Sequence, residues 1–119
     1  MSEIPWFKVD DTFSHHAKVM AAGNGAIGLW VRAGAWSMQQ LTDGFIPIHV
    51  ARQLGTRAEA KRLCDSGLWI EKDDGYLFHE WGQRQPSRAQ VHAEREAAAE
   101  RQRRGREAAK RRRQAGGES

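Results

Sequence analysis

The feature that most constrains the fold is the point along the chain at which bulky apolar side chains stop. They gather between Trp6 and Trp81, and the last of them is Val91. A folded core is built from such side chains, so it has to form before that point. The chain has 119 residues, enough for one compact domain with an appendage. We therefore predict a domain over residues 1–86 and an extension over residues 87–119.

The balance of positive and negative charge also changes near residue 87. Residues 1–87 carry nine Lys or Arg against ten Asp or Glu, whereas residues 88–113 carry ten against four. The formal net charge of +4 therefore comes from the extension. A dense run of positive charge is typical of segments that bind nucleic acid or acidic proteins.

The features that the sequence lacks narrow the class of protein. Cys64 is the only cysteine, which excludes an internal disulfide and zinc sites built on paired cysteines. No stretch approaches the ~18 apolar residues of a membrane span. Met1–Pro5 has no basic region followed by an apolar run, as a signal peptide would. We expect a cytoplasmic protein with no membrane partner.

The first half of the chain predicts an extended segment followed by two helices. Residues 6–13 mix aromatic and charged side chains, as a strand or an extended arm does. A short helix is expected over residues 14–22, with Ser14 as its N-cap, and a longer one over Ala26–Leu41. Gly28 and Gly34 lie inside the longer helix, where each is expected to permit the close approach of another element.

The second half predicts two short helices and a hairpin. Phe45 and Ile46 are too few for more than a one-rung strand, and Pro47 suits the first position of a helix that ends at Gly55. Thr56 and Glu59 then form a capping box for a helix over Arg57–Ser66. Two β-prone runs follow, joined by an Asp-Asp-Gly turn: Leu68–Lys72, Asp73–Gly75 and Tyr76–Glu80.

This order of elements, namely helix, short strand, helix, helix and hairpin, is that of a winged helix-turn-helix domain. The predicted fold class is α+β, mainly α, with a long basic C-terminal helix after the domain. In helix-turn-helix proteins the second helix of the pair enters the major groove of double-stranded DNA. The candidate DNA contacts in the domain are Arg52, Arg57, Lys61, Arg62 and Lys72. The alternative is that these are ordinary solvated charges, because Glu59, Asp65, Asp73 and Asp74 lie near them.

The extension predicts a basic helix or a partly disordered tail, because it has no apolar face to bury, and a solvated extension that serves solubility is an alternative. Ser87 and Gln90 form a capping box, and the run to Arg113 is rich in good helix formers. The helix has no apolar stripe for a coiled coil, so we expect it to bind phosphates. Two pairs have the spacing of favourable ion pairs, Glu100 with Arg104 and Glu107 with Arg111. The candidate DNA contacts are Arg88, Arg101, Arg103, Arg104, Arg106, Lys110, Arg111, Arg112 and Arg113.

Other functions stay open. A protein-interaction module would dock the basic extension on an acidic host or phage protein, and RNA is an alternative to DNA. A small metal-dependent nuclease would hold a divalent ion with Asp10, Asp11, His15 and His16, but no second acidic group completes a two-metal site. The chain has no Gly-rich phosphate loop with its lysine and no nucleophile elbow. We therefore expect a protein that is not an enzyme and that uses no metal or cofactor.

Several short segments resemble a group of small proteins from actinobacterial phages and related mobile elements. They lie within about residues 6–90: Trp6-Phe7-Lys8-Val9-Asp10-Asp11, Gly28-Leu29-Trp30, Ala33-Gly34-Ala35-Trp36, Thr42-Asp43-Gly44-Phe45-Ile46-Pro47, His49-Val50, Gly67-Leu68-Trp69 and Gln85-Pro86-Ser87-Arg88. Proteins of that group are described as helix-turn-helix DNA-binding proteins. In layout they are similar to the N-terminal winged-helix modules of phage replisome organisers and replication initiators.

The resemblance implies DNA binding in the cytoplasm of a bacterial host, with replication or host proteins as further partners. The chain lacks the second folded domain that larger replisome organisers use to load a helicase. We therefore expect an accessory or regulatory role in phage replication, or a role in excision, in place of a full initiator role.

Overall fold

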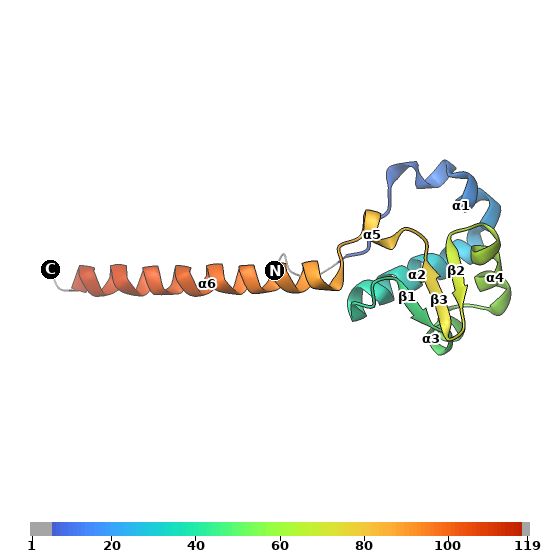
Figure 1. Ribbon diagram of the computed structural model, residues 1–119. Coiled ribbons are helices and arrows are strands. Elements are labelled where there is room, and N and C mark those ends of the chain that lie inside the picture. Colours follow the sequence, from blue (N-terminus) through green and yellow to red (C-terminus); the bar gives the residue numbers. More distant parts are fainter. Residues whose placement is uncertain (1–5, 118–119) are drawn as a thin grey trace. The chain divides into compact units, whose positions relative to one another are not determined.

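The computed structural model describes residues 6–117 of the chain, and helices predominate in it over a small antiparallel sheet. The α+β, mainly α class predicted from the sequence is thereby confirmed. The chain divides into two compact units, of which Pro5–Arg88 is one and the other includes Ala89–Ser119. The elements, shown in Figure 1, are a 3-10 helix at Asp11–His15, α1 (Ala17–Ala22), α2 (Asn24–Gln40), β1 (Phe45–Pro47), α3 (Ile48–Leu54), α4 (Arg57–Asp65), β2 (Trp69–Lys72), β3 (Gly75–Phe78), α5 (Trp81–Arg84) and α6 (Arg88–Gly117).

The start of α1 differs from the prediction. The chain is extended up to Asp10, as expected of an arm, but a 3-10 helix follows it at Asp11–His15. The N-cap of α1 is therefore His16, whose Nδ1 accepts a hydrogen bond of 3.2 Å from the backbone N–H of Lys18. Ser14 does not cap this helix, because its hydroxyl lies 2.8 Å from Nδ1 of His15 within the 3-10 turn.

The sheet has the strand order β1-β3-β2, with both pairs antiparallel. Gly75 is the first residue of β3 and not part of the turn as predicted, so Asp73 and Asp74 alone connect the hairpin. Gly75 pairs with Pro47, and a β-carbon at Gly75 would overlap the carbonyl oxygen of Ile46. Pro47 ends β1 and is the N-cap of α3, one position before the place predicted for it.

An aromatic cluster forms the core next to α2. Trp30 of α2 contacts Phe78 of β3 at a ring-centroid distance of 5.7 Å, and Phe7 of the arm lies 4.9 Å from Trp30. Phe7 fits a notch in α2 at Gly34, where a β-carbon would lie 2.5 Å from Cε2 of the Phe7 ring. Gly34 therefore permits close packing as predicted. Gly28 does not, because a β-carbon there would meet nothing within 4 Å.

The short helix α5 is absent from the predicted order of elements. Its first residue, Trp81, is buried against Gly44 and Phe78. The buried side chain of Gln85 follows it and holds the backbone of Lys8. Lys8 N–H donates to Oε1 of Gln85 at 3.0 Å, and Nε2 of Gln85 donates to the carbonyl of Lys8 at 2.7 Å. The arm is thus joined to the segment that follows α5.

Candidate nucleic-acid interface

The pair α3 and α4 is a helix, a tight turn and a second helix. Thr56 begins the second helix with the predicted capping box: its Oγ1 accepts from Glu59 N–H at 3.1 Å, and Glu59 Oε1 accepts from Thr56 N–H at 2.8 Å. Arg32 of α2 donates to the carbonyl of Leu54 at 3.0 Å, which satisfies the end of α3. These contacts fix where α4 starts and therefore which of its residues face outward.

One side of α4 is buried and the other carries the predicted basic residues. Ala60 and Leu63 are fully buried, whereas Arg57, Lys61 and Arg62 are exposed. The 3.6-residue period of a helix separates the two sets, as the sequence predicted. α4 thus presents three positive side chains on its open side.

Lys61 is paired with Asp65, whose charge was expected only to dilute the positive field of the helix. Its Nζ lies 2.8 Å from Oδ2 of Asp65, and the two side chains are 75% and 63% exposed. The hydrogen bond to Asp65, together with the negative charge of that carboxylate, raises the pKa of Lys61. The i,i+4 spacing of the two residues was the available signal for this pair.

Arg52 is turned inward, away from the outward position expected of a DNA contact. Its Nη2 donates to the hydroxyl of Tyr76 at 3.0 Å, and its guanidinium lies 5.7 Å from the centre of the Tyr76 ring. Its Nη1 is buried and has no hydrogen-bond partner among residues 6–117. Arg52 therefore joins α3 to β3 within the fold.

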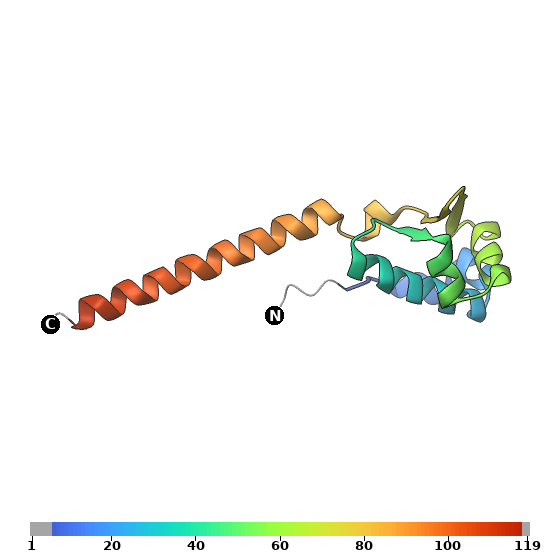
Figure 2. The same cartoon turned by 90° about the horizontal axis from the view of Figure 1, so that it is seen from below.

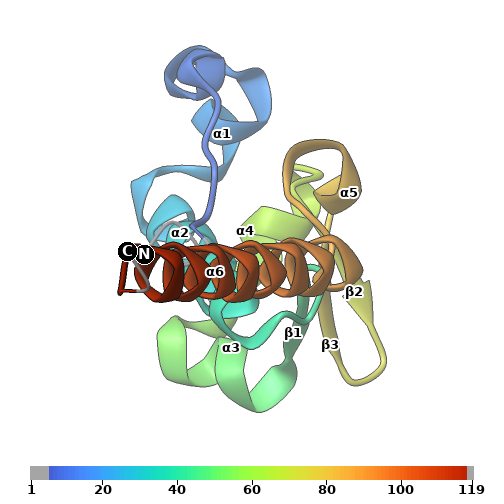
Figure 3. The same cartoon turned by 90° about the vertical axis from the view of Figure 1, so that its left-hand side faces the viewer.

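The hairpin carries more negative than positive charge. Lys72 is exposed, as predicted, but Glu71, Asp73 and Asp74 beside it are exposed too. The carbonyl of Asp74 accepts a hydrogen bond of 3.0 Å from the N–H of Ile48, so the turn is tied to the start of α3. Figures 1 and 3 both show the hairpin turn beside α3. Lys72 is thus the weakest of the predicted phosphate contacts.

α6 begins at Arg88, whose N–H donates to Oδ1 of Asp43 at 2.6 Å. Figure 2 shows the helix running without a break to its end. Of the two predicted ion pairs, Glu100 with Arg104 is present at 3.2 Å, and Glu100 also pairs with Arg103. Glu107 and Arg111, both within the described residues, form no ion pair. The predicted basic residues of this helix are all exposed: Arg88, Arg101, Arg103, Arg104, Arg106, Lys110, Arg111, Arg112 and Arg113.

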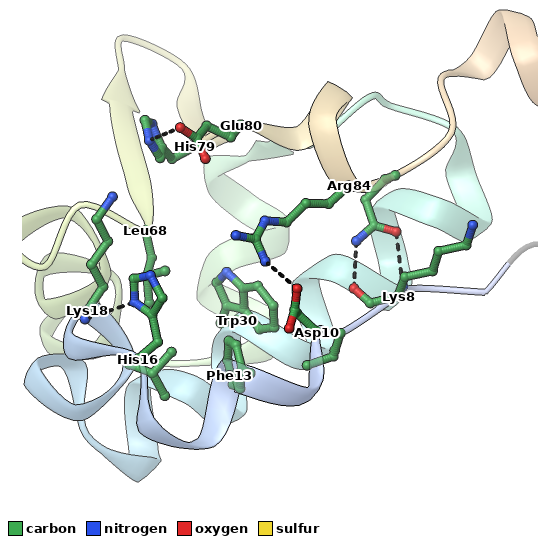
Figure 4. A pocket seen from close by; sticks show the side chains of 13 residues that line it. Lys8, Asp10, Phe13, His16, Lys18, Trp30, Leu68, His79, Glu80 and Arg84 are labelled. Atoms are coloured by element: carbon green, nitrogen blue, oxygen red, sulfur yellow. Dashed lines mark hydrogen bonds and ion pairs between the residues drawn. The ribbon is translucent and has the colours of Figure 1, made fainter.

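A pocket of about 70 Å³ lies within the first unit, between the arm, α1 and the segment after β3 (Figure 4). Two pairs of polar side chains lie close together in its lining. Nη1 of Arg84 lies 3.8 Å from Oδ2 of Asp10, and Nε2 of His79 lies 3.2 Å from Oε1 of Glu80. The N–H and the hydroxyl of Thr12 both donate to Asp10 and hold the pKa of that carboxyl below its usual value. The pocket thus lies where the arm meets the rest of the domain, and the pair of Arg84 with Asp10 links the two.

Two of the four residues expected to bind metal in a nuclease instead cap nearby helices. Asp10 caps the 3-10 helix and His16 caps α1. Across the described part of the chain, no three His, Cys, Asp or Glu side chains are placed to hold one metal ion.

None of the helices described in residues 6–117 combines the length and the apolar composition needed to cross a membrane.

Comparisons of the chain with protein-family models, with curated proteins and with solved structures gave no match.

Proposed function

We propose that this chain is a double-stranded DNA-binding protein of the winged-helix type, with α3 and α4 as its helix-turn-helix, β2 and β3 as its wing and α6 as a phosphate-binding tail. The observation that carries the proposal is the charge of α6. Residues 101–113 hold eight Lys or Arg and one Glu, and all eight basic side chains are exposed. Such a helix has little apolar surface for a protein core and a strong attraction for phosphates.

The arrangement of the first unit supports the same proposal. Its helix, strand, helix, helix and hairpin follow each other in the order typical of winged-helix domains, and β1 closes the sheet beside β3. α4 would enter the major groove, whose width admits one helix. Arg57, Lys61 and Arg62 would then meet the DNA. In keeping with the resemblance of its segments, we propose that the protein serves phage-type replication as an accessory or regulatory factor.

The two basic surfaces would contribute differently. α4 would set the register on the duplex through base edges, whereas α6 would supply affinity that does not depend on sequence. The acidic residues beside Lys72 make the wing a minor contributor. The division of labour predicts that substitutions in α4 and in α6 have separable effects.

The test is fluorescence-anisotropy binding of the full chain to random duplex DNA across a salt series. The plot of log K against log salt has a negative slope, and each phosphate that the protein no longer neutralises makes that slope less steep by about 0.9. Arg111→Gln, Arg112→Gln and Arg113→Gln together are therefore expected to make the slope less steep by about 2 to 3 and to weaken binding to all sequences alike. The matched control is Glu94→Gln with Glu96→Gln on the same helix, which removes negative charge and is expected to strengthen binding.

The outcomes separate the proposed function from its alternatives. No salt-dependent binding of duplex DNA by the full chain would overturn the proposal and favour an acidic protein as the partner of α6. Tighter binding to single-stranded or double-stranded RNA, measured in the same salt series, would favour RNA. Equal loss of affinity and of sequence preference from substitutions in α4 and in α6 would contradict the division of labour.

A further inference from the structure

The exposed side of α4 presents a hydrogen-bond donor and an acceptor as one unit. Nζ of Lys61 and Oδ2 of Asp65 lie 2.8 Å apart, and both side chains are largely open to solvent. We infer that this pair reads a single G·C base pair in the major groove, with Lys61 donating to guanine and Asp65 accepting from cytosine. The inference rests on the proposed DNA binding and specifies the residues that give it sequence preference.

The distance between Nζ of Lys61 and Oδ2 of Asp65 is close to the distance between guanine O6 and cytosine N4 in a G·C pair. In a G·C pair the cytosine N4 amino group donates to guanine O6 through an N–H···O bond of about 2.9 Å. The second hydrogen of N4 and the free lone pair of O6 both point into the major groove. A donor and an acceptor 2.8 Å apart, as in Lys61 and Asp65, can therefore face these two groups together. The ammonium group and the carboxylate stay close to each other when they do so.

Helix stability does not account for Asp65. An exposed ion pair contributes ~0–1 kcal/mol, and a basic residue placed N-terminal to an acidic one is the weaker of the two orientations. Asp65 is also the last residue of α4, where the helix dipole disfavours a negative charge. Near phosphates a carboxylate is repelled, so on a DNA-binding face it is favourable only where it meets an amino group of a base. These costs are offset if Asp65 selects the base pair.

The preference for G·C over A·T follows from the two neighbouring acceptors of guanine, N7 and O6. Guanine offers N7 and O6 side by side, so the ammonium group of Lys61 can reach both. In an A·T pair the acceptors N7 and O4 lie on either side of the N6 amino group, and the thymine methyl group crowds O4. Lys61 then reaches one acceptor while Asp65 binds N6. The pair therefore favours G·C.

The test is selection of duplexes bound by the full chain from a random pool, followed by anisotropy binding of the selected site and of the same site with each base pair exchanged. The wild-type chain is expected to require G·C at one position, by about tenfold or more. Asp65→Ala is expected to reduce that requirement to the part that Lys61 supplies through guanine N7 and O6, while binding exchanged sites at least as tightly as the wild type, because a repulsive charge is gone. Lys61→Ala is expected to abolish the requirement and to weaken binding to every site.

The control breaks an ion pair of the same kind outside α4. Glu100→Ala removes the partner of Arg103 and Arg104 on α6 and is expected to leave the base preference unchanged. A preference that Asp65→Ala leaves unchanged, or an Asp65-dependent position that is A·T, would overturn the inference while leaving the DNA-binding proposal intact. Failure of the wild-type chain to bind any duplex would instead overturn the proposed function itself. Circular dichroism of each variant confirms that it is folded.

Discussion

Substitution of two glycines on α2 is expected to have opposite effects on stability. Gly34→Ala places a β-carbon 2.5 Å from Cε2 and 2.6 Å from Cε1 of the Phe7 ring, so the ring has to leave its notch. Gly28→Ala places the same methyl group on the same helix, where no atom lies within 4 Å. The second variant is thus a matched control for the intrinsic effect of alanine in a helix.

The expected magnitudes follow from what each methyl group displaces. Alanine stabilises a helix by about 1 kcal/mol relative to glycine, and Gly28→Ala has no cost to set against this gain. Expulsion of a phenylalanine ring costs about 1.5–3 kcal/mol of burial, and each aromatic pair that is broken adds about 0.5–1.5 kcal/mol. Phe7 is half-buried and contacts Trp30 and Trp81 at centroid distances of 4.9 and 5.8 Å. Gly34→Ala is therefore expected to destabilise the domain by about 1–3 kcal/mol net.

The assay is urea unfolding followed by tryptophan fluorescence, which reports on the aromatic cluster. The free energies of unfolding of the two variants are expected to differ by about 2–4 kcal/mol, with wild type between them. In the Phe7→Ala background the cost of Gly34→Ala is expected to vanish, because the ring that clashes is gone. A Gly34→Ala variant as stable as Gly28→Ala would refute the packing assigned to Phe7.

Three further predictions concern the capping box, the arm and acid stability. Thr56→Val removes the acceptor for Glu59 N–H and is expected to lower the free energy of unfolding by about 1 kcal/mol in the same urea assay; an unchanged midpoint would mean that the box contributes nothing. Gln85→Leu leaves the backbone of Lys8 without its two partners and is expected to speed hydrogen exchange of the Lys8 amide; unchanged protection of that amide would contradict the clamp. The pKa of Asp10 is lowered in the fold, so its charge stabilises the protein above the ordinary value of 3.8 and this contribution is lost as the pH falls below it. Asp10→Asn is therefore expected to flatten the decline of the melting temperature on the acid side of 3.8, and identical pH profiles would exclude a role for this carboxyl.

Features encoded by neighbouring residues were predictable. The capping box of Thr56 needs only Glu59, and the outward set on α4 follows from the helical period. Features that depend on distant partners were not. Gln85 was unremarkable in sequence because the backbone that it holds lies 77 residues away, and Asp43 caps a helix that starts 45 residues later.

The candidate site shows the same limit. The sequence predicted Arg52 to be a cation on the surface. In the fold its side chain points inward and donates a hydrogen bond to Tyr76, 24 residues further along the chain. Gly28 and Gly34 look alike in sequence, and only the position of Phe7 distinguishes them. Asp65 looked like a charge that dilutes the basic face, whereas its position 2.8 Å from Lys61 makes it a partner.

The composition of α6 makes its own helicity sensitive to ionic strength. Like charges three or four residues apart on a helix repel by ~0.2–0.5 kcal/mol per pair, and Arg106 with Lys110 is one such pair within the basic run. Salt screens this repulsion over distances of ~10 Å at 0.1 M, so we expect the segment to become more helical as salt is added. The same addition would weaken the binding of phosphates that we propose for this helix. The phosphates of a bound duplex would neutralise the basic side chains of α6 and so stabilise the helix. Added salt reduces the same repulsion but also dissociates the DNA.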